Sequence, residues 1–187
     1  VSRDCATCAA RTQSHVLPEN RVFEDVKARI VDLDGDGVRE VLVVESDAEQ
    51  GSVLAIYGPR GRRAATAPGG PARSWLAPAG VGDFDDDGTL EIAYVDSPHK
   101  RRELVFVRFD GASLTEIDRV PGLTNHRPGD RQIWGGVRNC GRGDELLLAD
   151  PAWRRVMSVR LGDDKAKKVR ALRCPDDLVR PFACPAG

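Results

Sequence analysis

The chain has 187 residues, of which 41% are hydrophobic and 30% are charged, and this balance excludes an intrinsically disordered chain. Its apolar runs are far shorter than the roughly 18 residues that a membrane-spanning helix requires, so we expect no membrane span. The formal net charge is −1, and the 28 basic residues are scattered without a recognition-helix or RNA-binding motif, so we expect no nucleic-acid partner.

Short runs rich in Val, Ile, Leu and Thr, separated by Gly, Pro, Asn and Asp, predict strands along almost the whole chain. No segment keeps an apolar period of 3.6 over ten residues, so few helices are expected. We count about thirteen candidate strands. The first is at 11–17, and three groups of four follow: 27–33, 39–46, 52–58 and 64–68; then 76–83, 91–97, 103–109 and 114–120; then 131–139, 145–150, 156–162 and 166–173.

The first two groups share an acidic loop between their first and second strands. The pattern Asp-x-Asp-x-Asp-Gly-x-x-Glu starts at Asp32 and starts again 51 residues later, at Asp83. Calcium takes six to eight oxygen ligands, and alternate side chains of a tight loop converge on one point. The expected ligands are the side chains of Asp32, Asp34, Asp36 and Glu40 with the Val38 carbonyl, and those of Asp83, Asp85, Asp87 and Glu91 with the Thr89 carbonyl.

Each loop turns sharply at a glycine, Gly37 or Gly88, where we expect a positive φ. A plain Asp-rich turn is the alternative, since Asp and Gly are common in turns. Two copies with the same spacing argue against it and predict two Ca²⁺ sites. The third group departs from the pattern: Asn139 stands at its start, glycines replace carboxylates, and the loop runs two residues short before Glu145. We therefore expect this group to hold no metal.

The loops are similar to the EF-hand calcium loop, but their closing Glu falls at position nine, and strands flank them instead of helices. In this form they resemble the FG-GAP or VCBS repeats of integrin-like β-propellers, over residues 25–170. A period near 50 with four strands per unit also suits propeller blades. The expected fold is all-β and β-propeller-like, with about three four-stranded blades forming a partial propeller. The expected organisation is an N-terminal tail plus one strand of a preceding blade at 1–24, three blades at 25–173 and a Cys-containing tail at 174–187.

Four of the five cysteines lie near the ends of the chain, at positions 5, 8, 174 and 184, and the fifth is Cys140. A zinc site built from both tails is one interpretation, and disulfides that pin the tails in an oxidising compartment are the favoured one. We expect Cys174 and Cys184 to be oxidised, to each other or to the N-terminal pair, and Cys140 to be free. The predicted location is secreted or periplasmic.

The sequence shows no nucleophile–base motif and no phosphate loop. We therefore predict a non-enzymatic, calcium-binding module that binds or scaffolds a protein partner or another subunit. A set of arginines in long loops is expected to face that partner: Arg60, Arg62, Arg63, Arg73 and Arg127. The alternative is a propeller enzyme, a polysaccharide lyase or hydrolase, whose site the sequence does not reveal.

Overall fold

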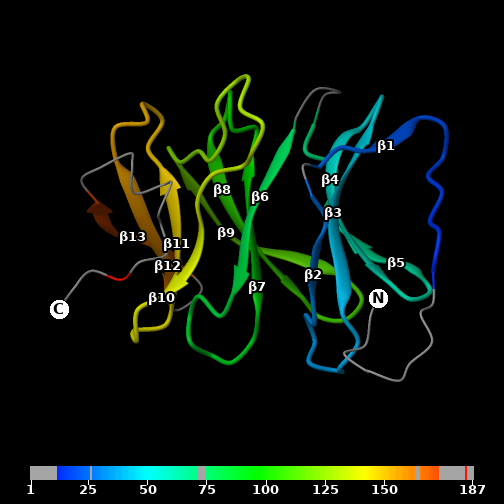
Figure 1. The fold of residues 1–187 in the computed structure, drawn as a ribbon, viewed down its shortest axis with the longest axis horizontal. Coiled ribbons are helices and arrows are strands. Elements are labelled where there is room, and N and C mark those ends of the chain that lie inside the picture. The colour runs from blue at the N-terminus through cyan, green and yellow to red at the C-terminus, as the bar shows by residue number, and fades with distance from the viewer. Residues whose placement is uncertain (1–11, 26, 71–74, 163–164, 173–183, 185–187) are drawn as a thin grey trace. The chain divides into compact units, whose positions relative to one another are not determined.

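The computed structural model describes residues 12–25, 27–70, 75–162, 165–172 and Cys184. These residues form thirteen strands and no helix, arranged in three antiparallel sheets (Figure 1). The chain divides into two compact units. Unit 1 comprises Val1–Trp75 and Phe109–Leu114, and unit 2 comprises Leu76–Arg108 and Thr115–Gly187. The predicted all-β fold, built from four-stranded antiparallel groups, is confirmed.

The sheet of unit 1 is built around its third strand. Its strands are β1 (Arg21–Phe23), β2 (Arg29–Val31), β3 (Glu40–Asp47), β4 (Gly51–Gly58) and β5 (Gly61–Ala65). Both β1 and β2 pair with the same side of β3. Strand β2 pairs at its start, with Val31 opposite Glu40, and β1 pairs at its end, with Arg21 opposite Asp47. Two short strands thus share the place of one blade strand.

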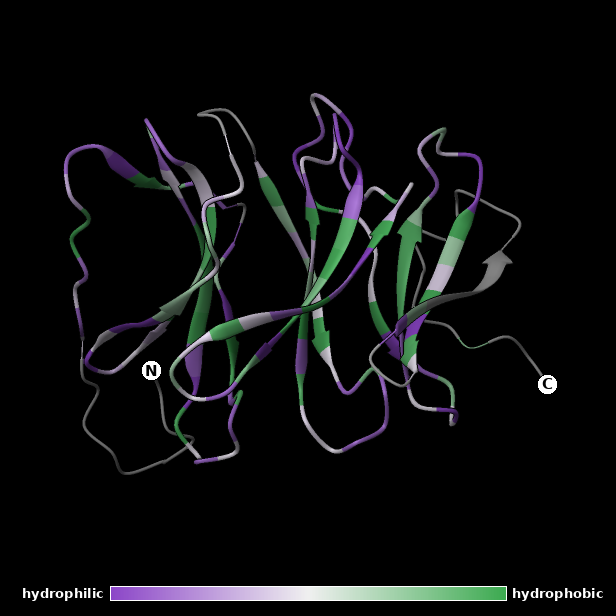
Figure 2. Ribbon diagram, turned by 180° about the vertical axis from the view of Figure 1, so that it is seen from behind, coloured by the Kyte–Doolittle hydropathy of each residue, from purple (hydrophilic) through white to green (hydrophobic). Residues whose placement is uncertain are grey.

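Both faces of this sheet are buried at its centre. Leu42 and Val44 of β3 lie opposite Ile56 and Leu54 of β4 on one face, and all four side chains are fully buried. On the other face Val43, Ala55 and Tyr57 form a core cluster, against which Leu17, Val41 and Ala65 pack. Burial on both faces explains why these strands read as nearly continuous apolar runs instead of alternating ones (Figure 2).

Unit 2 contains the other two sheets, except for Phe109 and Leu114 at the ends of β8 and β9, which belong to unit 1. The first has β6 (Leu76–Gly82), β7 (Glu91–Asp96), β8 (Glu103–Phe109) and β9 (Leu114–Pro121). The second has β10 (Gly136–Asn139), β11 (Asp144–Ala149), β12 (Val156–Gly162) and β13 (Lys165–Leu172). In each sheet every strand is bonded to its neighbour in sequence. This is the four-strand grouping that the sequence predicts for the second and third blades.

Small residues bring the two sheets of unit 2 together. A Cβ on Gly80 of β6 would overlap the side chain of Val137, and a Cβ on Gly82 would lie 2.7 Å from an oxygen of Asp144. Farther along, Thr124 forms a bridge with Ala149, and the amide of Leu161 donates to the carbonyl of Phe84 at 3.1 Å. These contacts hold the second sheet against β6, the loop that follows it and the segment after β9.

The N-terminal strand expected at 11–17 is wrong for the residues that the structure describes. Residues 12–17 form no strand, and the side chain of Val16 is 92% exposed. The edge of β3 is already taken by β1 and β2, so no unpaired edge remains there for a further strand. The predicted boundaries at 24/25 and 173/174 stay predictions. Among the described residues, none forms a helix of the length and hydrophobicity that a membrane span requires.

Candidate metal centres

The first acidic loop connects β2 to β3. Because Val31 pairs with Glu40, residues 32–39 form the turn between the two strands. Gly35 and Gly37 have φ values of 71° and 81°, in the left-handed region where only glycine is free of strain. The positive φ predicted for Gly37 is confirmed, and it lets the loop fold back on itself within eight residues.

Three aspartates of this loop converge. Asp32, Asp34 and Asp36 each offer a carboxylate oxygen, and these oxygens lie within 4.8 Å of one another. Backbone amides hold two of the side chains: Gly37 donates to Oδ2 of Asp32 at 2.9 Å, and Val38 donates to Oδ1 of Asp36 at 2.7 Å. The other oxygen of Asp32, Oδ1, is buried and has no hydrogen-bond partner. A buried carboxylate oxygen without a partner is costly, and a cation would relieve that cost.

Glu40 stands apart from these three aspartates. Its side chain is fully buried; the Leu33 amide donates to Oε2 at 3.0 Å, and Arg63 Nη1 donates to Oε1 at 2.7 Å. Arg63 Nη2 also donates to Oδ2 of Asp34 at 2.8 Å. Burial lowers the pKa of Arg63, but the hydrogen bonds that it donates to Asp34 and Glu40 outweigh burial and hold that pKa above its usual value. The guanidinium therefore bridges the buried glutamate and the exposed loop.

The second loop, between β6 and β7, repeats the first in detail. Gly82 pairs with Glu91, as Val31 pairs with Glu40. The same three backbone-to-carboxylate bonds recur 51 residues along the chain: Gly88 to Asp83 Oδ2 at 2.9 Å, Thr89 to Asp87 Oδ1 at 2.7 Å, and Phe84 to Glu91 Oε2 at 3.0 Å. Gly88 has a φ of 87°, as expected. The repeat seen in the sequence is thus a repeat of hydrogen bonds.

Three carboxylates also converge in the second loop, but the closing glutamate takes the place of the third aspartate. Asp83, Asp85 and Glu91 offer oxygens within 4.8 Å of one another, and Asp87 is not in this group. Burial raises the pKa of the Glu91 carboxyl, which is fully buried, while the Arg108 guanidinium and the Phe84 amide act in the opposite direction. Arg108 donates from Nε to Glu91 at 3.0 Å and from Nη2 to Asp85 at 2.9 Å.

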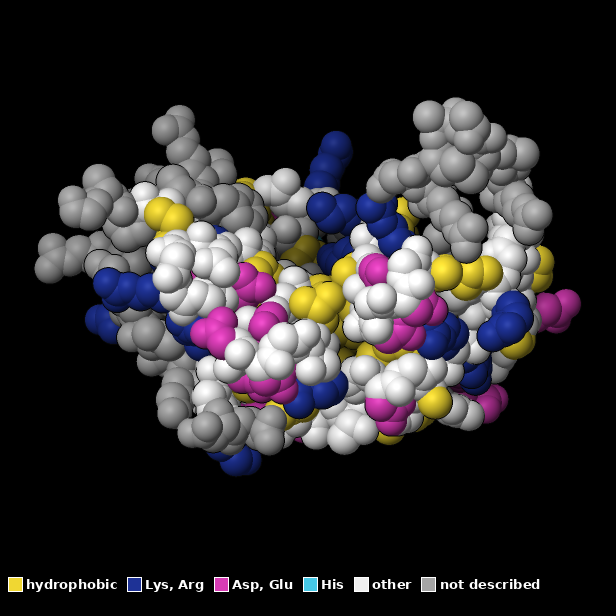
Figure 3. All heavy atoms as spheres, turned by 90° about the horizontal axis from the view of Figure 1, so that it is seen from below, with side chains coloured by type: hydrophobic (Ala, Val, Ile, Leu, Met, Phe, Trp, Pro, Cys, Tyr) yellow, Lys and Arg dark blue, Asp and Glu magenta, His cyan; other side chains and the backbone are white. Residues whose placement is uncertain are grey.

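The donor set of both loops fits a hard divalent cation. All the converging groups are carboxylate oxygens, the ligand type that calcium prefers, and loop 1 leaves a buried oxygen of Asp32 without a partner. Seen from below, acidic side chains have basic ones beside them (Figure 3). The role of every predicted ligand stays a prediction, including those of Asp87, Glu40 and the carbonyls of Val38 and Thr89, which lie outside the converging groups.

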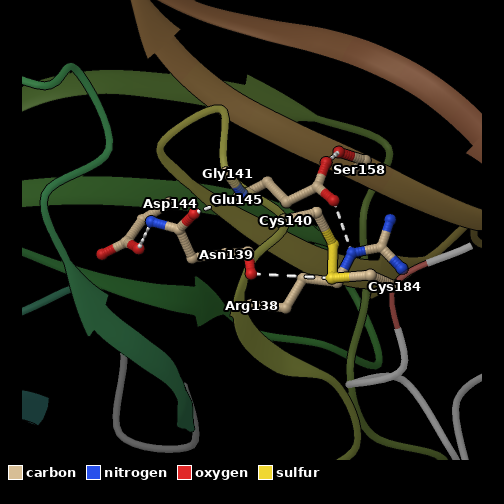
Figure 4. Close-up of a disulfide and its surroundings, with 8 residues drawn as sticks. All are labelled: Arg138, Asn139, Cys140, Gly141, Asp144, Glu145, Ser158 and Cys184. Carbon is tan, nitrogen blue, oxygen red and sulfur yellow. Dashed lines mark hydrogen bonds and ion pairs between the residues drawn. A yellow bond between two sulfur atoms is a disulfide. The ribbon is translucent and has the colours of Figure 1, made fainter. Parts of the chain in front are cut away.

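The loop of the third sheet is shorter and is tied differently (Figure 4). Asn139 pairs with Asp144, which leaves a four-residue turn, and its Nδ2 donates to Asp144 Oδ1 at 3.0 Å. Glu145, the counterpart of Glu40 and Glu91, is bonded to Arg138 and Ser158. Asp144 Oδ2 accepts from the Asp83 amide at 3.0 Å, so this turn buttresses the second acidic loop.

Cys140 is not the free thiol that the sequence suggested. It forms a disulfide with Cys184, with a Cα–Cα distance of 5.6 Å (Figure 4). Counted from the strand register, Cys140 stands where the other two loops have Leu33 and Phe84, which are buried. Cys5, Cys8 and Cys174 lie outside the described residues.

Two of the arginines expected to face a partner are ion-paired with acidic side chains of unit 1. Arg62 Nη1 donates to Oε2 of the buried Glu45 at 3.0 Å, and Arg63 is held by the first loop. Glu45 and Arg62 line a cavity of about 200 Å³ together with Arg21 and Asp47. Their charges are already paired with one another, since Arg21 Nε bonds Asp47 at 3.0 Å.

The other three arginines of that set differ in their surroundings. The guanidinium of Arg127 lies 4.2 Å from the ring centroid of Trp153, and Arg60 is exposed. Arg73 lies outside the described residues. The partner-facing assignment therefore stays a prediction for the whole set.

The structure also joins two histidines that look isolated in the sequence. His99 Nε2 lies 2.8 Å from His126 Nδ1, and burial, then His126 and Arg102, lower the pKa of His99. The pair links the turn after β7 to the segment after β9. Their spacing of 27 residues carries no local signal, so sequence reasoning missed it.

Comparison with known proteins supports the repeat and the fold. The family model for the FG-GAP-like repeat matches residues 32–94, which contain both acidic loops. No curated protein matches the sequence. Two solved structures do: a rhamnogalacturonan lyase, PL11, from Bacillus licheniformis, with 16% identity, 82% of this chain covered and a TM-score of 0.55; and rhamnogalacturonan lyase YesW, with 15% identity, 82% covered and a TM-score of 0.51.

The chain spans 34% of the length of each lyase chain, about a third. At these identities the likeness concerns the fold alone. The expected resemblance is confirmed where the family model matches, and the lyase structures agree with the expected partial propeller. The chain therefore carries an FG-GAP-like repeat at residues 32–94, within an all-β fold of propeller-type sheets.

Proposed function

We propose that the chain is a calcium-binding propeller module that acts as a non-enzymatic binding or scaffold domain. One observation carries the proposal: two loops, 51 residues apart, repeat the same three backbone-to-carboxylate hydrogen bonds and each gather three carboxylates within 4.8 Å. Three carboxylates held this close repel one another, and this repulsion destabilises the loop unless a positive charge compensates it. A bound cation supplies the compensating charge.

Calcium suits these loops better than a smaller cation. Calcium accepts six to eight oxygens in flexible geometry, whereas magnesium demands six in a near-ideal octahedron. The ligands proposed for loop 1 are Asp32, Asp34, Asp36, the Val38 carbonyl and Glu40. Those proposed for loop 2 are Asp83, Asp85, Asp87, the Thr89 carbonyl and Glu91. In both, the cation has a structural role, because it stabilises the turn between the first two strands of a blade.

The proposed partner is a protein or another subunit, and the proposed location is secreted or periplasmic. The disulfide between Cys140 and Cys184 supports the location, because disulfides persist in oxidising compartments. In favour of a non-enzymatic role, the charges around the cavity of about 200 Å³ in unit 1 are paired internally, which leaves little capacity for acid–base chemistry there.

Thermal unfolding tests the proposal. A cation that binds only the native state raises the melting temperature, so the full chain should melt higher in calcium than in chelator. Glu116→Gln, which removes an exposed carboxylate that pairs with Arg119 outside both loops, is the matched control and should keep the calcium response. Equal melting temperatures in calcium and in metal-stripped chelator buffer would refute calcium binding.

A second candidate is part of a polysaccharide lyase. Its support is the fold likeness to two rhamnogalacturonan lyases, of which this chain spans about a third. The test is incubation of the chain with rhamnogalacturonan and detection of unsaturated uronyl ends by ultraviolet absorbance. Absorbance that grows with time and is lost in heat-treated protein would favour the lyase. A flat trace is expected for the binding module.

A further inference from the structure

One arginine enters each acidic loop, from a different strand in each case. In loop 2 it is Arg108, which lies directly opposite Glu91 in the pairing of β7 with β8. In loop 1 it is Arg63, which comes from β5. Despite this difference, both contact the same two positions: the buried glutamate that closes the loop, and the third residue of the loop, Asp34 or Asp85.

The backbone of unit 1 explains how a residue from another strand reaches that place. Since Val41 pairs with Tyr57, the position opposite Glu40 falls on Gly58, which has no side chain. The Arg63 side chain fills the vacancy, and its Cδ lies 2.9 Å from where a Cβ of Gly58 would be. A guanidinium thus occupies equivalent space in both loops, although the residue that supplies it differs.

The buried glutamate of each loop explains why a guanidinium is needed there. Glu40 and Glu91 are fully buried, and a buried carboxylate without a counter-charge is strongly destabilising. Asp34 and Asp85, however, belong to the carboxylate groups that a cation would use. The arginine therefore neutralises the glutamate and, through the same guanidinium, competes for one carboxylate of the cluster.

We propose that Arg63 and Arg108 are the resident counter-cations of the two loops. They keep each loop folded without metal, and a divalent cation has to take Asp34 or Asp85 from them. The second half of this inference rests on the proposed calcium binding, and the first half does not. If the arginine only stabilised the loop fold, its removal would weaken calcium affinity. If it competes with calcium for a carboxylate, its removal strengthens calcium affinity.

The experiment compares Arg63→Met and Arg108→Met with the full wild-type chain. Arg101→Met is the control, because Arg101 is 45% exposed and pairs with the buried Asp96 outside both loops. Melting in chelator measures the first half: both loop variants should melt below wild type. For Arg108→Met, adding Glu91→Gln should recover part of the loss, because the uncompensated buried charge is gone.

Calorimetric titration with calcium chloride measures the second half. The site of the altered loop should bind calcium about tenfold more tightly, because a positive charge has left it, and the other site should not change. Arg108→Lys keeps the charge but not the fork, so it guards against a misfolded Met variant. It should melt close to wild type in chelator, and it should bind calcium more tightly than wild type but less tightly than Arg108→Met, because it releases Asp85 while the positive charge stays.

The possible failures are distinguishable. Loop variants as stable as wild type in chelator would overturn the counter-cation role, and calcium affinity that falls or stays constant in both Met and Lys variants would overturn the competition. If no protein, wild type or variant, binds calcium, the calcium proposal and the competition both fall, while the melting comparison still decides the counter-cation role. Calcium binding in the variants alone would refute calcium binding by the wild-type chain and would support the competition.

Discussion

Glu91 and Arg108 face each other across β7 and β8, with Nε of the arginine 3.0 Å from Oε1 of the glutamate. The glutamate is fully buried, and the arginine side chain is 29% exposed. Buried ion pairs contribute little when they are complete, but loss of one partner is costly. The Glu91 side chain also accepts the Phe84 amide, so it links the loop to the sheet.

Glu91→Gln should therefore destabilise the metal-free protein by about 1–3 kcal/mol, because Arg108 loses its closest counter-charge and the shape of the side chain is kept. Urea unfolding in chelator measures this. Glu103→Gln, whose side chain is 30% exposed and pairs with Arg119, should change stability by less than about 0.5 kcal/mol. Equal effects of the two substitutions would show that burial of Glu91 is not decisive.

Gly80→Ala should destabilise unit 2 by about 1–3 kcal/mol, since the new methyl group would overlap the side chain of Val137 on the facing sheet. Val137→Ala removes the obstructing methyl groups. The double variant should lose less unfolding free energy than the two single variants lose together, and urea unfolding can measure this difference. Strict additivity would mean that the sheets are not in contact at this point.

The pH dependence of stability should include a contribution from Asp110. Its carboxylate accepts hydrogen bonds from the Ser113 hydroxyl and from the amides of Ala112 and Ser113, and these lower its pKa to about 2. Because the folded pKa lies below the unfolded value, the stabilisation is present above about pH 4 and is lost as the pH falls toward 2. The stability difference between wild type and Asp110→Ala should therefore shrink below pH 4. A constant difference from pH 3 to 6 would contradict this.

Reduction of the Cys140–Cys184 disulfide should lower the free energy of unfolding. Cys140 and Cys184 are 44 residues apart, and opening a loop of that length typically costs about 2–4 kcal/mol. Cys184→Ser should lower stability in non-reducing buffer and have little effect after reduction. Peptide mapping of the unreduced protein after alkylation should find Cys140 and Cys184 unalkylated. Alkylation of both would disprove the pairing.

Local patterns in the sequence predicted the features that depend on neighbouring residues. The strands from β2 onward, the sharp turn at Gly37 and the convergence of Asp32, Asp34 and Asp36 all follow from residue type and spacing within a few positions, whereas β1 was not predicted. The repeat at Asp83 strengthened the predictions for the loop, because a chance pattern is not expected to recur with the same spacing of acidic residues.

The features that sequence reasoning missed depend on strand pairing. Arg108 is 17 residues from Glu91 and Arg63 is 23 from Glu40, and only the register of the hairpins brings them together. Counting outward from the turn after β7 would have placed Arg108 opposite Glu91. No such count finds Arg63, because it fills the place of a glycine on another strand. Likewise, the spacing of the cysteines does not reveal that Cys140 pairs with Cys184.

Calcium stoichiometry tests the central claim most directly. Calorimetric titration of the metal-stripped full chain should find two sites, and Asp34→Ala and Asp85→Ala should each retain one, because each substitution removes a carboxylate from one cluster only. Glu116→Gln should retain both. A wild-type chain that takes up no calcium, or single variants that both keep two sites of unchanged affinity, would contradict calcium binding by these loops.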